Sequence, residues 1–122
     1  MKKILIVEDE LSYVKLLKDQ LSSKNYEVFI ASNGKEGLAL AKKHNPDLIL
    51  LDIKMPIMDG MTMLDILRRT ENGTVTKVIV LTNLEPTGKI IGNAIKDQLT
   101  FYFVKSDTKL TNLFKKIKEL IG

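Results

Sequence analysis

Residues 47–60 read Asp-Leu-Ile-Leu-Leu-Asp-Ile-Lys-Met-Pro-Ile-Met-Asp-Gly, a solid apolar run followed by a polar, irregular segment. The run from Leu48 to Leu51 is typical of a strand that is covered on both faces of a sheet. It ends at Asp52, and Pro56 and Gly60 favour a loop over either regular structure. A doubly covered strand with a polar loop after it indicates an α/β protein with a parallel sheet.

The same alternation of short apolar runs and helical spacing continues to both ends of the chain. Apolar runs predict five strands, at residues 3–7, 27–31, 47–51, 78–81 and 101–104. Helical periodicity predicts five helices, at about residues 11–21, from a cap at Ser32 or Asn33 to just before Asn45-Pro46, 61–70, 86–97 and 110–121. The pattern predicts a doubly wound, five-stranded parallel sheet with right-handed crossovers.

Length and composition limit the possible functions. A chain of 122 residues without cysteine is the size of one domain, so we expect a single domain over 1–122 with no output domain in this chain. The absence of cysteine excludes disulfides, zinc knuckles and thiol nucleophiles. The longest apolar runs are far shorter than the roughly 20 residues that span a bilayer. We therefore expect a cytoplasmic protein with no membrane partner.

The net charge of +4 comes entirely from residues 77–122, which hold eight lysines and four acidic residues. Scattered lysines without interleaved aromatic residues are typical of solvated helix faces, and they disfavour nucleic-acid binding by this domain alone. If this part of the chain forms a partner surface, an acidic protein fits it better than nucleic acid.

Polar side chains follow four of the predicted strands. Glu8 and Asp9 follow the first, Asp52 the third, Thr82 the fourth and Lys105 the fifth. Ligands of doubly wound proteins bind at the carboxyl ends of the strands, so these groups should converge on one crevice. Clustered carboxylates repel one another unless a cation neutralises them, and all-oxygen ligands suit Mg²⁺, with Mn²⁺ possible. A carboxylate such as Asp52 can also act as the nucleophile in phosphoryl transfer.

The sequence resembles the receiver domains of two-component response regulators, including the chemotaxis regulators, over its whole length. The matching segments are Ile4–Glu10, Pro46–Pro56 with Met58-Asp59-Gly60, Val80-Leu81-Thr82 and Phe103-Val104-Lys105. The resemblance implies a flavodoxin-like fold with strand order 2-1-3-4-5. It also implies a phosphoprotein of a phosphorelay, which assists its own phosphorylation and dephosphorylation without being an enzyme in the usual sense.

The resemblance further assigns roles to residues. Asp52 is the expected site of phosphorylation by a sensor histidine kinase. Glu8, Asp9, Asp52 and the main-chain carbonyl of Lys54 are the expected surroundings of Mg²⁺, with Glu8 acting through water. Lys105 is expected to pair with the phosphoryl group and Thr82 to hydrogen-bond it. Tyr102 is the expected aromatic switch, and the surface formed by the fourth helix, fifth strand and fifth helix would then change for a downstream effector.

Three segments depart from the family pattern. Ser106 follows Lys105 where the family usually has proline, which disfavours a cis peptide bond there. Asn83 replaces a small residue after Thr82, and Gln98-Leu99 replaces the usual Gly-Ala. These departures leave a second function open, a constitutive interaction module of the same fold that is not phosphorylated.

Two other functions are disfavoured by single features. Mg²⁺-dependent phosphatases and phosphomutases that use an aspartate nucleophile carry a second aspartate two residues later, where this chain has Lys54. An electron-transfer flavoprotein would need a phosphate-binding loop rich in Ser and Thr after the first strand, and the residues there are Glu8-Asp9-Glu10.

Overall fold

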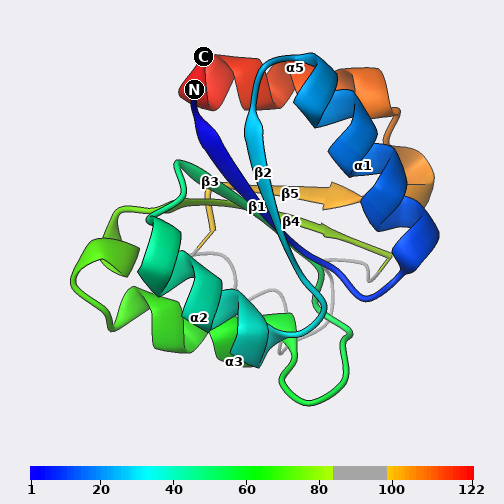
Figure 1. Ribbon diagram of the computed structural model, residues 1–122. Helices are drawn as coiled ribbons and strands as arrows, with labels where there is room; N and C mark the ends of the chain where they lie inside the picture. Colours follow the sequence, from blue (N-terminus) through cyan, green and yellow to red (C-terminus); the bar gives the residue numbers. More distant parts are fainter. Residues whose placement is uncertain (84–98) are drawn as a thin grey trace.

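The computed structural model describes residues 1–83 and 99–122 (Figure 1). Its strands are β1 (Lys3–Val7), β2 (Glu27–Ala31), β3 (Leu48–Leu51), β4 (Lys77–Thr82) and β5 (Phe101–Val104). Its α-helices are α1 (Leu11–Ser23), α2 (Gly34–His44), α3 (Gly60–Arg68) and α5 (Leu110–Ile121). Two 3₁₀ turns, η1 (Asn72–Thr74) and η2 (Lys105–Asp107), complete the described elements.

The five strands form one parallel sheet in the order β2-β1-β3-β4-β5, which confirms the predicted topology. β3 lies at its centre, and Leu48 to Leu51 are all buried, as expected of a strand covered on both faces. In Figure 1, α1 and α5 lie on one side of the sheet and α2 and α3 on the other. The expected helix at 86–97 lies outside the described residues.

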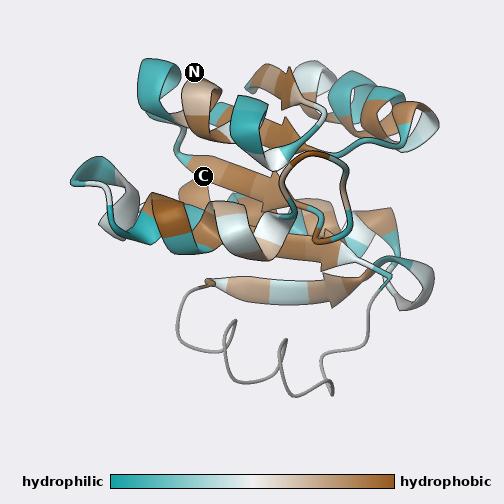
Figure 2. Cartoon of the chain, turned by 90° about the horizontal axis from the view of Figure 1, so that it is seen from below, coloured by the Kyte–Doolittle hydropathy of each residue, from teal (hydrophilic) through white to brown (hydrophobic). Residues whose placement is uncertain are grey.

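Alternate residues of each strand supply the two faces of the sheet with separate cores. Ile4, Ile6 and Leu50 belong to the first core, which packs under α1 and α5. Leu5 and Val7 belong to the second, which packs under α2 and α3. Figure 2 shows the strands as predominantly hydrophobic and the helices as two-faced, so burial of one stripe on each helix is what attaches the helices to the sheet.

The helix ends follow local signals in the sequence. Asn33 is the N-cap of α2, because its side chain accepts a hydrogen bond of 2.9 Å from the Glu36 N–H. α2 ends at His44, and Asn45 adopts a left-handed conformation with φ 46° ahead of Pro46. The predicted cap and the predicted stop are both confirmed.

Candidate functional site

The register of the sheet brings the polar residues at the strand ends together. Val7 of β1 pairs with Leu51 of β3, so the next residues, Glu8 and Asp52, come side by side. Both are held by main-chain hydrogen bonds, from Glu8 N–H to Ala31 and from Asp52 N–H to Val7. Thr82 ends β4, one strand further along the sheet. The crevice predicted from the sequence is therefore present at the carboxyl edge of the sheet.

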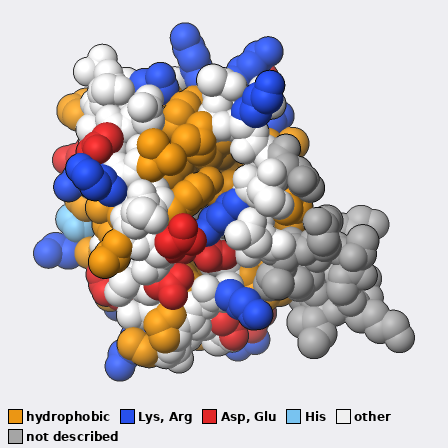
Figure 3. All heavy atoms as spheres, turned by 90° about the vertical axis from the view of Figure 1, so that its right-hand side faces the viewer, with side chains coloured by type: hydrophobic (Ala, Val, Ile, Leu, Met, Phe, Trp, Pro, Cys, Tyr) orange, Lys and Arg blue, Asp and Glu red, His pale blue; other side chains and the backbone are white. Residues whose placement is uncertain are grey.

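A cleft of about 310 Å³ opens at this edge. Its lining consists of Glu8, Asp9, Glu10, Asp52, Lys54, Thr82, Asn83 and Lys105. Figure 3 looks onto this edge and shows acidic side chains gathered beside a basic one near the centre of the face. All the residues predicted for metal and phosphoryl binding thus line one cleft, whereas Tyr102 is not among its lining residues.

Three carboxylates in the cleft form a compact oxygen cluster. One carboxylate oxygen from each of Glu8, Asp9 and Asp52 lies within 4.8 Å of the other two. Glu8 and Asp52 are buried and Asp9 is exposed, so the cluster opens to solvent on one side. Carboxylate oxygens at this separation, with room for water, suit an octahedral Mg²⁺ ion, so the residues present fit the predicted metal.

Lys105 joins the acidic cluster from β5. It follows Val104 as the first residue of η2, and its ammonium forms ion pairs with the Glu8 carboxylate and, at 3.4 Å, with Asp52 Oδ2. The lysine side chain is only 9 % exposed. Burial acts to lower the pKa of Lys105, but the Glu8 hydrogen bond and the charges of Asp52 and Glu8 outweigh it and raise that pKa. The ammonium is therefore firmly protonated.

Glu8 is the most perturbed acid of the site. Burial raises its pKa from the ordinary 4.5 to about 7, and the negative charge of Asp52 adds to this effect. Hydrogen bonds from Lys105 and from the Glu10 N–H oppose the rise. The metal-free cleft is therefore electrostatically strained, since one ammonium faces three carboxylates.

The loop between β3 and α3 is folded tightly against Asp52. The Gly60 N–H donates a 2.8 Å hydrogen bond to the Ile53 carbonyl, and a side chain at position 60 would collide with the Asp52 carbonyl oxygen. Asp59 caps α3 by accepting a hydrogen bond of 2.8 Å from the Thr62 N–H. The sequence thus places an aspartate and a glycine here to start a helix at close range, and Asp59 is not part of the acidic cluster.

The middle of the same loop contains an unusual turn. The Met58 N–H donates to the Pro56 carbonyl at 2.7 Å, which closes a three-residue turn around Ile57. Ile57 has φ 69°, although a β-branched residue rarely adopts positive φ, and its side chain is exposed. Gly34, at the start of α2, packs closely against this loop, and its N–H donates a 2.9 Å hydrogen bond to the Met58 carbonyl. The loop beside Asp52 is therefore held in place by hydrogen bonds to the first residues of α2 and α3.

The predicted switch residues occupy two different environments. Thr82 is buried and lines the cleft, as expected for a group that could reach a ligand on Asp52. Tyr102 is half-buried and packs against the second core, on the α2 and α3 side of the sheet. Every peptide bond among the described residues is trans, which includes the bond between Lys105 and Ser106.

Sequence reasoning missed one residue that contacts the site. Tyr13 lies in the first turn of α1, and the Lys105 ammonium sits 4.5 Å from the centre of its ring. Only its position, five residues after Glu8 and near the start of the helix that follows the acidic pair, could have pointed to it. Its side chain has no ligand chemistry that a motif would signal.

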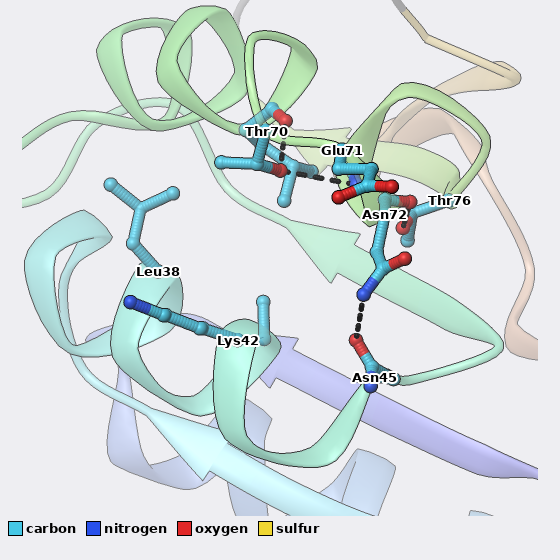
Figure 4. Close-up of a pocket in the computed structure, with 10 residues that line it drawn as sticks. Leu38, Lys42, Asn45, Thr70, Glu71, Asn72 and Thr76 are labelled. Carbon is cyan, nitrogen blue, oxygen red and sulfur yellow. Dashed lines mark hydrogen bonds between the residues drawn. The ribbon is translucent and has the colours of Figure 1, made fainter.

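A second cavity, of about 350 Å³, lies at the opposite edge of the sheet between the ends of α2 and α3. Its residues include Leu38, Lys42, Thr70 and Glu71, and the Asn72 side-chain amide donates to Asn45 at 3.3 Å across its mouth (Figure 4). Thr70 also hydrogen-bonds to neighbouring main-chain groups. This cavity therefore belongs to the packing of two helix ends and holds none of the acidic residues of the cleft.

Strand order, oxygen cluster and buried lysine together define a flavodoxin-like α/β protein whose strand ends are equipped for a metal ion and a phosphoryl group. The model of the response regulator receiver domain family matches residues 4–118. The chain belongs to this family. It is therefore a phosphoacceptor signalling module of two-component systems rather than an enzyme in the usual sense, and its family implies a histidine kinase as partner.

Curated relatives are longer than this chain. PhoP, the alkaline phosphatase synthesis transcriptional regulatory protein of Bacillus subtilis (strain 168), is 46% identical over 68 residues, which cover 56% of this chain and 28% of PhoP. The probable transcriptional regulator ycf27 of Porphyra purpurea is 40% identical over 83 residues, covering 68% of this chain and 33% of ycf27. The chain thus spans about a third of the length of these relatives.

Solved receiver domains match the whole fold. One of them is the receiver domain of the sensor histidine kinase PA1611 from Pseudomonas aeruginosa PAO1, which has a magnesium ion coordinated in its active site cleft. It superposes with a TM-score of 0.87 at 26% identity, and the match covers 99% of this chain and 98% of the PA1611 domain. The response regulator TrrA from Thermotoga maritima, in complex with Mg²⁺-BeF, gives a TM-score of 0.84 at 33% identity over 99% and 100% of the two chains. Among residues 1–83 and 99–122, no helix is long and apolar enough to cross a membrane.

Proposed function

We propose that Asp52 accepts a phosphoryl group from a sensor histidine kinase in a reaction that depends on Mg²⁺. The observation that carries this proposal is the position of Asp52 within an oxygen cluster and against a buried lysine. One Asp52 oxygen, Oδ1, accepts a 2.7 Å hydrogen bond from the Ile53 N–H, and the other, Oδ2, faces the Lys105 ammonium. The carboxylate is therefore oriented before any donor arrives, which is how a site lowers the entropic part of a barrier.

Glu8, Asp9, Asp52 and the main-chain carbonyl of Lys54 are the groups that would hold Mg²⁺, with Glu8 acting through water. A bound Mg²⁺ would neutralise charge on the phosphoryl oxygens during transfer. Glu8 and Asp52 lie on the buried side of the cleft, whereas Asp9 is exposed. The outer side of the cleft is therefore open to solvent and to the phosphodonor. Mn²⁺ prefers the same hard oxygen ligands and should substitute.

The Asp52 carboxylate oxygen attacks phosphorus, and the bond from phosphorus to the donor nitrogen breaks, so the product is an acyl phosphate on Asp52. Lys105 then exchanges part of its pairing with Glu8 and Asp52 for the phosphoryl oxygens, which carry more negative charge than the carboxylate they replace. Thr82 supplies a hydroxyl hydrogen bond to the same group. Hydrolysis of the acyl phosphate returns Asp52 to its free form.

The signal would leave the site through a change in the surface that includes β5 and α5. Movement of Thr82 toward the phosphoryl group draws the end of β4 inward, and Tyr102 on the neighbouring strand changes its rotamer. The expected contribution of the fourth helix falls on residues outside the described ranges. The lysines of α5 favour an effector with an acidic surface over nucleic acid.

We also propose that residues 1–122 act as one receiver domain and that the domain works in the cytoplasm, where a histidine kinase would phosphorylate it. The first core contains residues from Ile4 to Ile121, and the second packs on the other face of the same sheet, which supports one folding unit. PhoP and ycf27 contain further sequence beyond the segment that matches this chain. The proposal therefore concerns the chemistry of the receiver domain and not the output of a longer protein.

The proposal is tested by intact-mass measurement after incubation with a small phosphodonor, such as phosphoramidate, and Mg²⁺. We expect the wild type to gain one phosphoryl group and Asp52→Asn to gain none. Removal of Mg²⁺ with a chelator should abolish the adduct. Asp59→Asn provides a matched control, because Asp59 is an acid on the same loop that caps α3 instead of lining the cleft.

A wild type that gains no adduct with any small donor would refute the proposal and favour the alternative, a constitutive interaction module of the same fold. An adduct of equal size on Asp52→Asn would place the phosphoryl group on another residue and would also contradict it.

A further inference from the structure

Tyr13 contacts Lys105 from α1 without lining the cleft. The Lys105 ammonium is 4.5 Å from the centre of the Tyr13 ring, inside the range of about 6 Å in which an aromatic face attracts a cation. The ring is half-buried and packs against the first core, while the lysine side chain is 9 % exposed. This is therefore a largely desolvated cation–π contact, the kind in which the attraction is strongest.

The contact differs in kind from the two ion pairs of the same ammonium. Glu8 and Asp52 bind Lys105 by charge, and a Mg²⁺ ion near their oxygens would reduce that attraction. The ring of Tyr13 carries no charge, so its attraction for Lys105 is unaffected when the carboxylates are neutralised. It also leaves the N–H groups of the ammonium available to other acceptors.

Lys105 needs such support because of where it lies in the chain. It is the first residue of a single 3₁₀ turn, η2, and its ammonium must cross from β5 to the cleft on a flexible four-carbon stem. A lysine that loses its carboxylate partners would otherwise regain rotamer freedom.

We infer that Tyr13 is a positioning residue that holds the Lys105 ammonium at the cleft, so that the ammonium is in place when a phosphoryl group forms on Asp52. The inference rests on the proposed function, since it concerns the same site. It assigns the task to the aromatic ring and not to the hydroxyl group.

Beryllofluoride, which mimics a phosphoryl group on a carboxylate, is the probe. Calorimetric titration with beryllofluoride at saturating Mg²⁺ should give a dissociation constant about three- to tenfold higher for Tyr13→Leu than for the wild type. Tyr13→Phe should stay within about twofold of the wild type, because it keeps the ring. Titration with Mg²⁺ alone should be unchanged in both variants, since Tyr13 does not line the cleft that holds the three carboxylates.

Phe101→Leu is the matched control, because Phe101 makes the same kind of contact with Lys116, at 4.3 Å, near the start of β5. It should leave beryllofluoride binding unchanged. A loss of Mg²⁺ affinity by the same factor in Tyr13→Leu would indicate a structural role, and an equal loss of beryllofluoride affinity in Tyr13→Phe would assign the effect to the hydroxyl group. Either result would overturn the inference. Wild-type affinity in Tyr13→Leu would overturn it directly.

A second measurement needs no variant. The ε-methylene protons of Lys105 should show an upfield ring-current shift in the NMR spectrum of the wild type, and this shift should persist when Mg²⁺ and beryllofluoride are added. Loss of the shift on addition would overturn the inference while leaving the proposed function intact. Failure of the wild type to bind beryllofluoride at all would instead count against the proposed function.

Discussion

Asp52 lies buried beside two other acids, although its proposed role as phosphoryl acceptor requires a free carboxylate. Its charge adds to the burial that raises the pKa of Glu8, and Lys105 is the one cation of the cleft lining that pairs with both. A group that is kept for chemistry at the expense of folding stability is typical of functional sites.

Replacing this carboxylate should therefore stabilise the metal-free protein. We expect Asp52→Asn to raise the unfolding free energy by ~1–2 kcal/mol and the melting temperature by several degrees in chelator-treated buffer, since one of three mutually repelling charges is removed. Thermal denaturation followed by circular dichroism measures this. The stabilisation that Mg²⁺ gives to the wild type should largely disappear in the variant.

Equal melting temperatures with and without the carboxylate, together with equal stabilisation by Mg²⁺, would contradict this account of the cleft. Asp59→Asn is again the control, and it should not gain stability, because it weakens the cap of α3.

Among the elements, the start of α3 sets the geometry of Asp52, the proposed acceptor. Gly60 is the first residue of α3 and lies directly against the Asp52 main chain. The helix can begin there only because no side chain intervenes. The position of Asp52 thus depends on a residue that takes no part in the chemistry.

Gly60→Ala should consequently damage both stability and phosphorylation. The added methyl group would overlap the Asp52 carbonyl oxygen, so the loop must shift, and we expect a loss of ~1–3 kcal/mol in unfolding free energy. The rate of phosphorylation by a small donor, measured by intact mass at a temperature where the variant is folded, should fall more than tenfold. Full activity in Gly60→Ala would show that the loop adapts without moving Asp52.

At the level of elements, the sequence predicted most of the structure. The apolar runs located all five strands to within a residue or so, since strands buried on both faces leave a strong pattern. The expected helix at 61–70 instead covers Gly60–Arg68, and the turns η1 and η2 were not foreseen, because single 3₁₀ turns have no periodicity to detect. The strand order came from the family resemblance, since hydrophobic patterns do not specify which strands are neighbours.

The residues expected for metal and phosphoryl binding do line one cleft, but their pairing was not predicted, Tyr102 lies outside the cleft, and Tyr13 was missed. Charged residues that directly follow an apolar run are easy to recognise in a sequence, which is why Asp52, Glu8 and Lys105 could be named in advance. The ion pair between Lys105 and Glu8 and the contact with Tyr13 depend on side-chain directions that only the packed structure fixes.

For the molecule as a whole, Glu8 makes stability depend on pH. Its pKa is about 7 in the folded state and near 4.5 when unfolded, so the folded state binds the proton more tightly. The resulting stabilisation is complete below about pH 4.5 and is lost as the pH rises toward 7 and above. We expect the metal-free protein to lose ~2 kcal/mol of unfolding free energy from this group between pH 5 and pH 8.

Urea denaturation at several pH values, in the wild type and in Glu8→Gln, separates this contribution from those of other groups. The variant should show a flatter dependence over the same interval. Saturating Mg²⁺ should also flatten it in the wild type, because a cation favours the ionised carboxylate. An identical pH profile in the two proteins would mean that Glu8 titrates normally.

Both ends of the chain emerge at the amino edge of the sheet, where Met1 and Gly122 line the same hollow (Figure 1). The five residues of β1 separate that edge from the cleft by about 16 Å of extended chain. A tether attached to either end would leave the cleft facing away from the support. The protein can therefore be immobilised on a sensor chip, or fused to a fluorescent reporter at both ends, without obstructing access to the cleft.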